Sequence, residues 1–304
     1  MALYNLLGDF KLIKETPFKY EKEIQSLIES NLQSLLKLDY IRSEFSHNNF
    51  RVDTLAFDNE SKSFVIIEFK REKNFSVIDQ GYAYLSLMLN NKADFILEYN
   101  ERKDIPLKRS DVDWTQSKVI FISPHFTTYQ KEAINFKDLP IELWEIKKYE
   151  NNTISFNQLQ KTYANESIKT ISNKETVKNV SNEVVVYTEE AHLIKTDFET
   201  KELYESYKEG ILNLEDNIEL NPKKHYIGFK IDGNTFCDIV FQNKTLKIFI
   251  NLKYGELNDG KDLARDVSNI GHWGNGAYEI KVSDTENLEY ILSLIKQSLR
   301  KNKG

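Results

Sequence analysis

The sequence lacks cysteine pairs, histidine pairs and long apolar runs. Its single cysteine, Cys237, cannot form an intrachain disulfide, and one thiol excludes a metal site built from thiolates. No apolar run has the length of a membrane span, and residues 1–9 lack the charged start and apolar stretch of a signal peptide. We therefore expect a cytoplasmic location. The five histidines show no H-x-H or H-E-x-x-H spacing, which argues against a histidine-based zinc site; they are His47, His125, His192, His225 and His272.

The sequence also lacks an excess of positive charge. It has 41 Lys and Arg against 47 Asp and Glu, a net charge of −6. Residues 1–150 hold 21 basic against 24 acidic side chains, and the remainder holds 20 against 23, so both halves share the deficit. Local basic clusters occur at residues 70–73 and 296–303. Because nucleic-acid-binding proteins are usually basic, any affinity of this chain for nucleic acid should be modest and sensitive to salt.

The length and composition predict two domains joined by a linker. A chain of 304 residues is long for one domain, and 40% hydrophobic residues allow each half to bury a core. Residues 158–190 are rich in Asn, Lys, Ser, Thr and Glu and hold few large apolar side chains, which is typical of a polar, partly disordered linker. We therefore predict domains over residues 1–157 and 191–304.

A predicted hairpin in the first domain brings acidic side chains together. Two apolar strands, 50–57 and 64–70, flank a polar turn, and folding about that turn places Asp53 opposite Ile67 or Glu68. Glu68 and Lys70 share one face because side chains alternate along a strand. Glu68 directly follows an apolar run, where a charge is costly without a purpose. Two neighbouring carboxylates repel each other unless a cation lies between them, and Mg²⁺ prefers such oxygen ligands.

The order of elements around this hairpin resembles the PD-(D/E)xK nuclease superfamily. An amphipathic helix with acidic residues, 20–36, precedes the Asp and Glu-x-Lys strands, and a helix over 77–87 with Gln80 and Tyr84 follows. Val52 stands where the superfamily often has proline. The ordered set carries the resemblance, because Glu-x-Lys alone also begins at Glu60, Glu101, Glu145, Glu199 and Glu279.

The resemblance implies a restriction-endonuclease-like α/β fold, with a mixed sheet flanked by helices, and a Mg²⁺-dependent DNA endonuclease for which Mn²⁺ is an alternative metal. Asp53 and Glu68 would bind the metal, and Lys70 would orient the attacking water or stabilise developing charge. Gln80 would orient the water or the scissile phosphate, or is only a helix-surface amide. Tyr84 is more typical of packing.

Further candidates surround this centre. A helix acid, Glu21 or Glu29, would add an outer-shell or second-metal contact, and the sequence does not separate the two. Arg51 is either a phosphate contact or a structural ion pair. Arg71 and Lys73 belong to a basic cluster that suits DNA.

The second domain is predicted as a smaller α-β-β-β-β-α module. Helices over 199–214 and 287–299 enclose strands at 226–231, 235–241, 245–251 and 278–282. It resembles a C-terminal domain of unknown function found joined to such nuclease cores, and a substrate-recognition role is the natural hypothesis. The loop Gly271–Gly276 presents His272 and Trp273, which either stack on a base near Arg265 or form a tight structural turn, the reading we favour.

Two other classes of function stay open. One is a nucleic-acid-binding or regulatory protein with a degenerate nuclease fold, which would bind DNA without metal-dependent turnover. The other is a structural or protein-interaction module, which would bind no Mg²⁺ or Mn²⁺. A homodimer is a further expectation, because many enzymes of this fold pair up to cut two strands. The form of the substrate and a role in restriction, defence or repair are not readable from the sequence.

Overall fold

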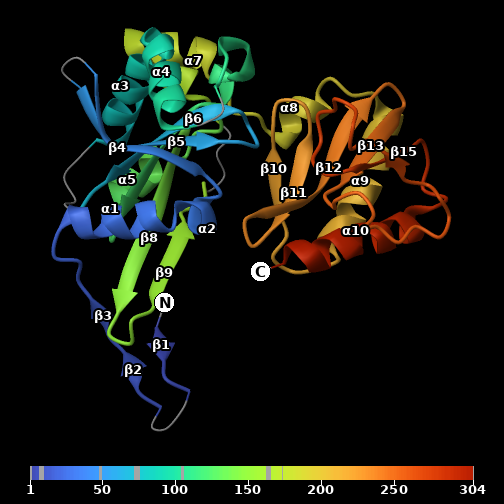
Figure 1. The fold of residues 1–304 in the computed structure, drawn as a ribbon, viewed down its shortest axis with the longest axis horizontal. Coiled ribbons are helices and arrows are strands. Elements are labelled where there is room, and N and C mark those ends of the chain that lie inside the picture. The colour runs from blue at the N-terminus through green and yellow to red at the C-terminus, as the bar shows by residue number, and fades with distance from the viewer. Residues whose placement is uncertain are drawn as a thin grey trace. The chain divides into compact units, whose positions relative to one another are not determined.

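The computed structural model describes residues 2–6, 10–47, 50–71, 76–103, 106–161, 166–172 and 174–303. The chain divides into two units, Met1–Val186 and Tyr187–Gly304. Each unit has its own sheet (Figure 1). Each unit also has its own buried hydrophobic residues. Within the described residues, no helix combines the length and the apolar content that a membrane crossing needs.

The first unit is built on a seven-stranded mixed sheet with the order β3-β8-β7-β6-β5-β4, to which β9 adds by pairing with β8. The middle strands β6, β7 and β8 run parallel, whereas β4, β5 and β6 form antiparallel pairs. The strands are β3 (Glu15–Thr16), β4 (Asp39–His47), β5 (Phe50–Asp58), β6 (Ser63–Phe69), β7 (Lys118–Ser123), β8 (Ile141–Tyr149) and β9 (Ile154–Gln158). A separate two-stranded sheet pairs β1 (Leu3–Tyr4) with β2 (Leu12–Ile13).

Helices cover both faces of this sheet (Figure 1). Every residue of β6 is buried, as expected for a central strand with helices on both sides. One face packs against α1 (Glu21–Ser30) and α2 (Leu32–Leu36). The helices on the other face are α3 (Val77–Asn90), α4 (Lys92–Arg102), α5 (Thr128–Ala133) and α7 (Glu175–Glu183), with the short turns η1 (Arg109–Asp111) and η2 (Trp114–Gln116) and the helix α6 (Ile168–Ile171) beside them.

The linker predicted over 158–190 is wrong for most of the described residues. The first unit extends to Val186, and α7 packs against α3 with buried valines that belong to the core. These valines, Val177, Val180 and Val184, are spaced three and four residues apart, so they form one helical stripe. A few well-placed apolar side chains therefore anchor a segment whose average composition is polar. Residues 162–165 and 173 lie outside the described part of the chain.

The second unit holds an antiparallel six-stranded sheet with the order β10-β11-β12-β13-β15-β14. Its strands are β10 (Glu219–Pro222), β11 (Ile227–Ile231), β12 (Asn234–Gln242), β13 (Thr245–Ile250), β14 (Arg265–Asp266) and β15 (Tyr278–Val282), and its helices are α8 (Glu189–Leu193), α9 (Phe198–Leu212) and α10 (Leu288–Asn302). Helices α9 and α10 pack on the sheet to form the core. Asp232 and Gly233 both have positive φ, 49° and 75°, as a tight hairpin turn requires.

The predicted fold class is confirmed: a mixed sheet flanked by helices is followed by a smaller α/β domain. The expected α-β-β-β-β-α order of the second domain is present, and the short strands β10 and β14 are additions to it. The predicted first helix is divided at Asn31 into α1 and α2.

Candidate active site

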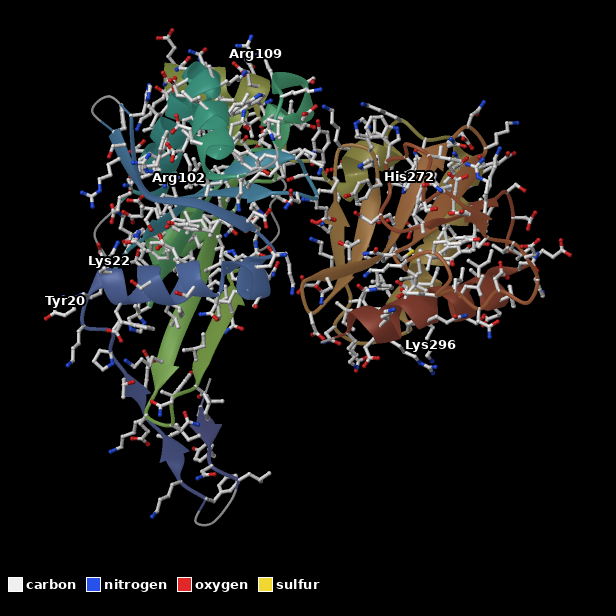
Figure 2. All side chains as sticks on the ribbon, viewed as in Figure 1. Tyr20, Lys22, Arg102, Arg109, His272 and Lys296 are labelled. Atoms are coloured by element: carbon white, nitrogen blue, oxygen red, sulfur yellow. The ribbon has the colours of Figure 1, made fainter. Side chains whose placement is uncertain are left out.

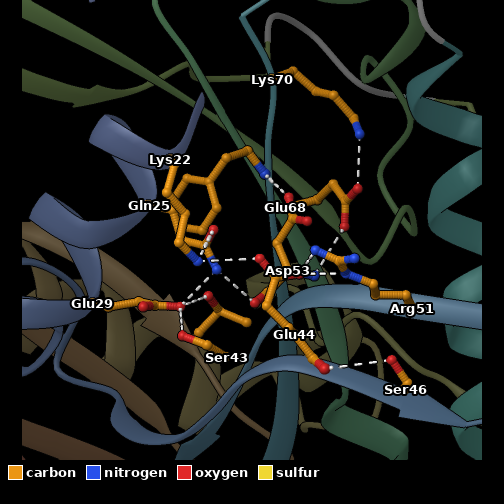
Figure 3. Close-up of polar contacts among 12 residues, drawn as sticks. Lys22, Gln25, Glu29, Ser43, Glu44, Ser46, Arg51, Asp53, Glu68 and Lys70 are labelled. Atoms are coloured by element: carbon orange, nitrogen blue, oxygen red, sulfur yellow. Dashed lines mark hydrogen bonds and ion pairs between the residues drawn. The ribbon is translucent and has the colours of Figure 1, made fainter. Parts of the chain in front are cut away.

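Asp53 and Glu68 lie side by side on paired strands of the first unit. The register Thr54↔Ile67 places Asp53, within β5, beside Glu68, near the end of β6. The Phe69 N–H donates to Asp53 Oδ2 at 2.8 Å, and the Asp53 N–H reaches Glu68 Oε2 at 3.5 Å. Each carboxylate thus contacts the main chain of the opposite strand (Figure 3). The prediction that one acid from each strand converges on one place is confirmed.

Lys70 and Gln80 complete this group from two further positions. Lys70 directly follows β6, and its Nζ donates to Glu68 Oε1 at 2.7 Å (Figure 3). Gln80 on α3 donates to the same oxygen at 3.3 Å and to the Tyr84 hydroxyl at 2.9 Å. The Glu68 side chain is only 5% exposed, whereas that of Lys70 is 20% exposed. The site therefore combines the buried carboxylate of Glu68 with the partly exposed ammonium group of Lys70, which is bound to it.

The electrostatics of the pair favour an added positive charge. Burial, and next the negative charge of Glu68, raise the pKa of Asp53 to about 6. Burial and the same Glu68 charge also raise the pKa of the Tyr84 hydroxyl. Two carboxylates lie together with one ammonium group, so their mutual repulsion adds to the effect of burial on the pKa of Asp53.

The donor set at this place suits Mg²⁺ bound with few protein ligands. Among the described residues no group of three or more His, Cys, Asp or Glu side chains is arranged to hold a metal ion. Asp53 and Glu68 offer carboxylate oxygens, which are hard ligands. Mg²⁺ usually keeps several waters and is bound by one or two carboxylates together with substrate phosphates, so two acids are sufficient for it.

The two helix acids do not join the Asp53–Glu68 pair by direct contact. Glu21, at the start of α1, accepts a hydrogen bond from the Arg71 N–H at 2.8 Å. Glu29 accepts hydrogen bonds from the hydroxyls of Ser43 and Thr54, and so connects α1 to β4 and β5. Both acids are occupied by contacts that position main chain and helix. Their role as metal ligands stays a prediction.

Gln25 is a site residue that the sequence interpretation missed. It is 4% exposed, and its Nε2 donates to the Asp53 carbonyl and to Glu29 Oε1, both at 2.9 Å (Figure 3). Lys22 in turn donates to Gln25 Oε1 at 3.1 Å. The available signal was a polar residue within the apolar stripe of α1, one turn before Glu29. Its contact with Asp53 fixes the main chain that carries the acid.

The expected basic contacts have different outcomes. Arg51 is exposed and forms an ion pair with Glu44, which agrees with the structural alternative (Figure 3). The same Glu44 hydrogen bond raises the pKa of Arg51. Arg71 donates from its guanidinium to the Lys19 carbonyl. Lys73 lies outside the described residues. A contact of any of these three with DNA stays a prediction.

The loop of the second unit places His272 and Trp273 in different surroundings. Both ring nitrogens of His272 (Figure 2) face main-chain carbonyls, of Ile270 at 2.7 Å and of Gly276 at 3.0 Å. Trp273 remains 62% exposed, with its ring stacked on His225 at 3.7 Å. The expected structural turn therefore describes His272, whereas Trp273 does not cap a core.

Two sequence comparisons place the chain among known proteins. A protein of Haemophilus influenzae (strain ATCC 51907 / DSM 11121 / KW20 / Rd), described as uncharacterized, is 55% identical over 295 residues, which is 96% of this chain and 97% of that protein. The family described as a domain of unknown function, DUF5655, matches residues 175–301. The second match covers most of the second unit and confirms the expected C-terminal domain of unknown function.

Solved structures show only distant similarity. The EndoMS–dsDNA2 complex matches with 16% identity and a TM-score of 0.28 over 45% of this chain and 48% of that chain. A repair endonuclease from Pyrococcus abyssi matches with 19% identity and a TM-score of 0.23 over 40% and 45%. The Pyrococcus furiosus SfsA structure with Ca²⁺ has 12% identity and a TM-score of 0.25 over 52% and 75%. The matches span about half the length of the first two proteins.

Proposed function

We propose that this chain, which belongs to one family with the uncharacterized Haemophilus influenzae protein, is a metal-dependent endonuclease that hydrolyses phosphodiester bonds of DNA. The observation that carries the proposal is the Asp53–Glu68 pair on adjacent strands, with Lys70 bound to Glu68 at 2.7 Å. A buried acid, Glu68, a partly buried acid, Asp53, and one cation leave an excess of negative charge, which stability alone does not favour. A divalent cation and a phosphate would together balance that charge.

The reaction assigns a distinct task to each residue. Asp53 and Glu68 would hold Mg²⁺ or Mn²⁺, which when bound lowers the pKa of a water and neutralises phosphate charge. Lys70, 20% exposed, can face both Glu68 and an incoming phosphate, so it would orient the water or stabilise charge that develops on the phosphate oxygens. Gln80 holds Glu68 from α3 and would keep that carboxylate aimed. Gln25 would keep Asp53 in place through its main chain.

The direct test is DNA cleavage by purified full-length protein. Supercoiled plasmid, linear duplex, single-stranded and branched DNA, together with RNA, are incubated with Mg²⁺, Mn²⁺ or EDTA. Wild type is compared with Glu68→Gln and with Glu145→Gln. Glu145 is the matched control because it begins another Glu-x-Lys on strand β8 of the same sheet but pairs with Lys131. We expect metal-dependent cutting of DNA that is lost in Glu68→Gln and kept in Glu145→Gln.

Three other outcomes of this cleavage test would contradict the proposal. Cutting that survives in Glu68→Gln would place the activity elsewhere. Cutting of RNA alone would change the substrate. DNA binding with no turnover in any metal would assign the chain to the nucleic-acid-binding class with a degenerate nuclease site.

A further inference from the structure

A cavity of about 550 Å³ lies beside the loop 267–273 of the second unit. Strands β12, β13, β14 and β15 contribute to its lining together with that loop. Its size falls within the range of small-molecule sites and is sufficient for a single nucleotide. The residues that matter for the argument are Gln242, Lys247, Arg265, Trp273 and Glu279.

The charged groups of this cavity leave a positive excess. Glu279, whose side chain is 6% exposed, accepts from Lys247 at 3.1 Å and from Arg265 at 2.9 Å. Among the described residues that line the cavity, Glu279 is the sole carboxylate. Two permanent cations therefore face one anion. Lys247 and Arg265 keep 24% and 60% of their side chains exposed, so both remain accessible to a second anionic partner such as a phosphate.

Two large apolar side chains at the cavity are exposed to solvent. Trp273 is 62% exposed and Ile270 is 51% exposed. The ring of Trp273 stacks on His225 with an interplanar angle of 24°, which fixes its orientation. A large exposed apolar side chain held in a fixed orientation beside two cations is the arrangement that stacks a base and binds its phosphate.

The loop that carries Trp273 is fixed by a buried carboxylate and by two tightly packed glycines. The fully buried carboxylate of Asp238 accepts from Asn275 Nδ2 at 2.9 Å and from the Asn275 N–H. Gly276 has a φ of +88°, and a Cβ there would collide with the Ile250 carbonyl. A Cβ at Gly274 would collide with the Phe249 ring. Asp238 and these two glycines hold the loop tightly against strands β12 and β13, so the exposed indole of Trp273 is presented from a well-fixed main chain.

We infer that this cavity binds one unpaired nucleotide of a DNA strand. The base would stack on Trp273, the phosphate would contact Arg265 and Lys247, and Gln242 would be within the cavity for hydrogen bonding to the base edge. The base must be unpaired because bases inside a duplex have their ring faces covered by neighbours. The inference rests on the proposed function in one respect, the choice of DNA as the source of the nucleotide.

The test measures binding without cleavage. Full-length protein in EDTA is titrated into a short fluorescein-labelled oligothymidylate and into a duplex of the same length, with fluorescence anisotropy as the readout. We expect the single strand to bind more tightly than the duplex. Trp273→Ala should weaken single-strand binding about tenfold, and Trp273→Phe should retain most of it. Phe198→Ala is the matched control, because Phe198 is a 72% exposed aromatic on α9 of the same unit and does not line the cavity.

Arg265→Gln tests the phosphate contact separately. It should weaken binding and reduce the salt dependence of log K by about one unit of slope. Equal affinity of wild type, Trp273→Ala and Phe198→Ala would overturn the inference. Binding of thymidine monophosphate with quenching of tryptophan fluorescence, in the absence of oligonucleotide binding, would overturn DNA as the source. Because these titrations contain no metal, their failure is distinct from failure of the cleavage assay, and cleavage lost in Glu68→Gln with binding retained would separate the two sites.

Discussion

Two buried glutamates, one in each unit, are surrounded by opposite charge excesses. The side chains of Glu68 and Glu279 are 5% and 6% exposed, and each lies on a sheet strand that has neighbours on both sides. Glu68 lies beside Asp53 and forms an ion pair with one cation, Lys70. Glu279 forms ion pairs with two cations, and there is no second acid among the described residues that line its cavity. The first arrangement suits a metal ion, and the second suits a phosphate.

The same sequence motif leads to these two results. Glu68 and Glu279 each begin a Glu-x-Lys, but only Glu68 uses its own lysine. Lys281 is exposed, and the cations on Glu279 come instead from β13 and β14. The chemistry of such a glutamate is therefore decided by the residues that neighbouring strands bring to it.

The largest effect on DNA cleavage is expected from removing the Glu68 charge, with Glu279→Gln as the comparison. Glu68→Gln should lower the rate of plasmid cutting in Mg²⁺ at least about 100-fold, because it removes the proposed metal ligand and the partner of Lys70. Glu279→Gln should retain measurable, metal-dependent cutting. Loss of cutting to the same extent in both variants would break the distinction between the two sites.

Lys70→Met should have the next largest effect. It removes the cation beside the pair while leaving both carboxylates, so plasmid cutting should fall roughly tenfold to a hundredfold. Protection of the protein by Mn²⁺ against thermal unfolding should persist. Lys281→Met, the lysine of the other motif, serves as the control and should cut at the wild-type rate. A Lys70→Met protein that cuts normally would remove Lys70 from the reaction.

Asp53→Asn should stabilise the metal-free protein in a pH-dependent way. The pKa of Asp53 is raised to about 6 in the folded chain, so the folded state binds more protons than the unfolded state between about pH 4 and pH 6. Wild type therefore loses stability as pH rises through that window, and the variant does not. Above about pH 6 the variant should be more stable by roughly 3 kcal/mol, and below about pH 4 the two should be equal. Urea unfolding in EDTA at several pH values measures this difference, and a variant less stable than wild type above pH 6 would contradict it.

The smallest effect is expected from Glu279→Gln on DNA binding. Without the carboxylate, Lys247 and Arg265 would face the cavity with two positive charges in excess. Affinity for single-stranded oligothymidylate in EDTA should rise about threefold to tenfold and become more sensitive to salt. The loss of stability should be modest because both cations are partly exposed. Weaker binding by this variant would show that Glu279 itself contacts the ligand.

The hairpin of the candidate site could be predicted because its signals are local. The apolar strands, the polar turn and the alternation of side chains place Asp53, Glu68 and Lys70 within a few residues of one turn. The sequence left two registers open, and the pairing Thr54↔Ile67 selects between them. Gln25 and Glu29 reach this place only through the packing of α1 on the sheet, so no local pattern determines their contacts.

The sequence did not predict features whose pattern is irregular, whose apolar residues are hidden by a polar average composition, or whose side chains meet only in the folded sheet. Strand β4 contains a register shift between Tyr40 and Arg42, which breaks the alternation that marks a strand. The segment around Val177 and Val180 looks like a linker because its average composition is polar, while its few valines follow a helical period. The cavity cations Lys247 and Arg265 are distant in sequence from Glu279, so their convergence follows from sheet order alone.

The carboxylates of Asp53 and Glu68 are proposed to bind a metal ion, whereas Glu279 is not. The most direct test of this difference is a Mn²⁺ titration of the full-length protein in the absence of DNA, followed by electron paramagnetic resonance. The proposed function predicts one saturable Mn²⁺ site in wild type that is lost in the Asp53→Asn, Glu68→Gln double variant and kept in Glu279→Gln. Absence of a saturable site in wild type, or an unchanged site in the double variant, would contradict the assignment of Asp53 and Glu68 to a metal ion.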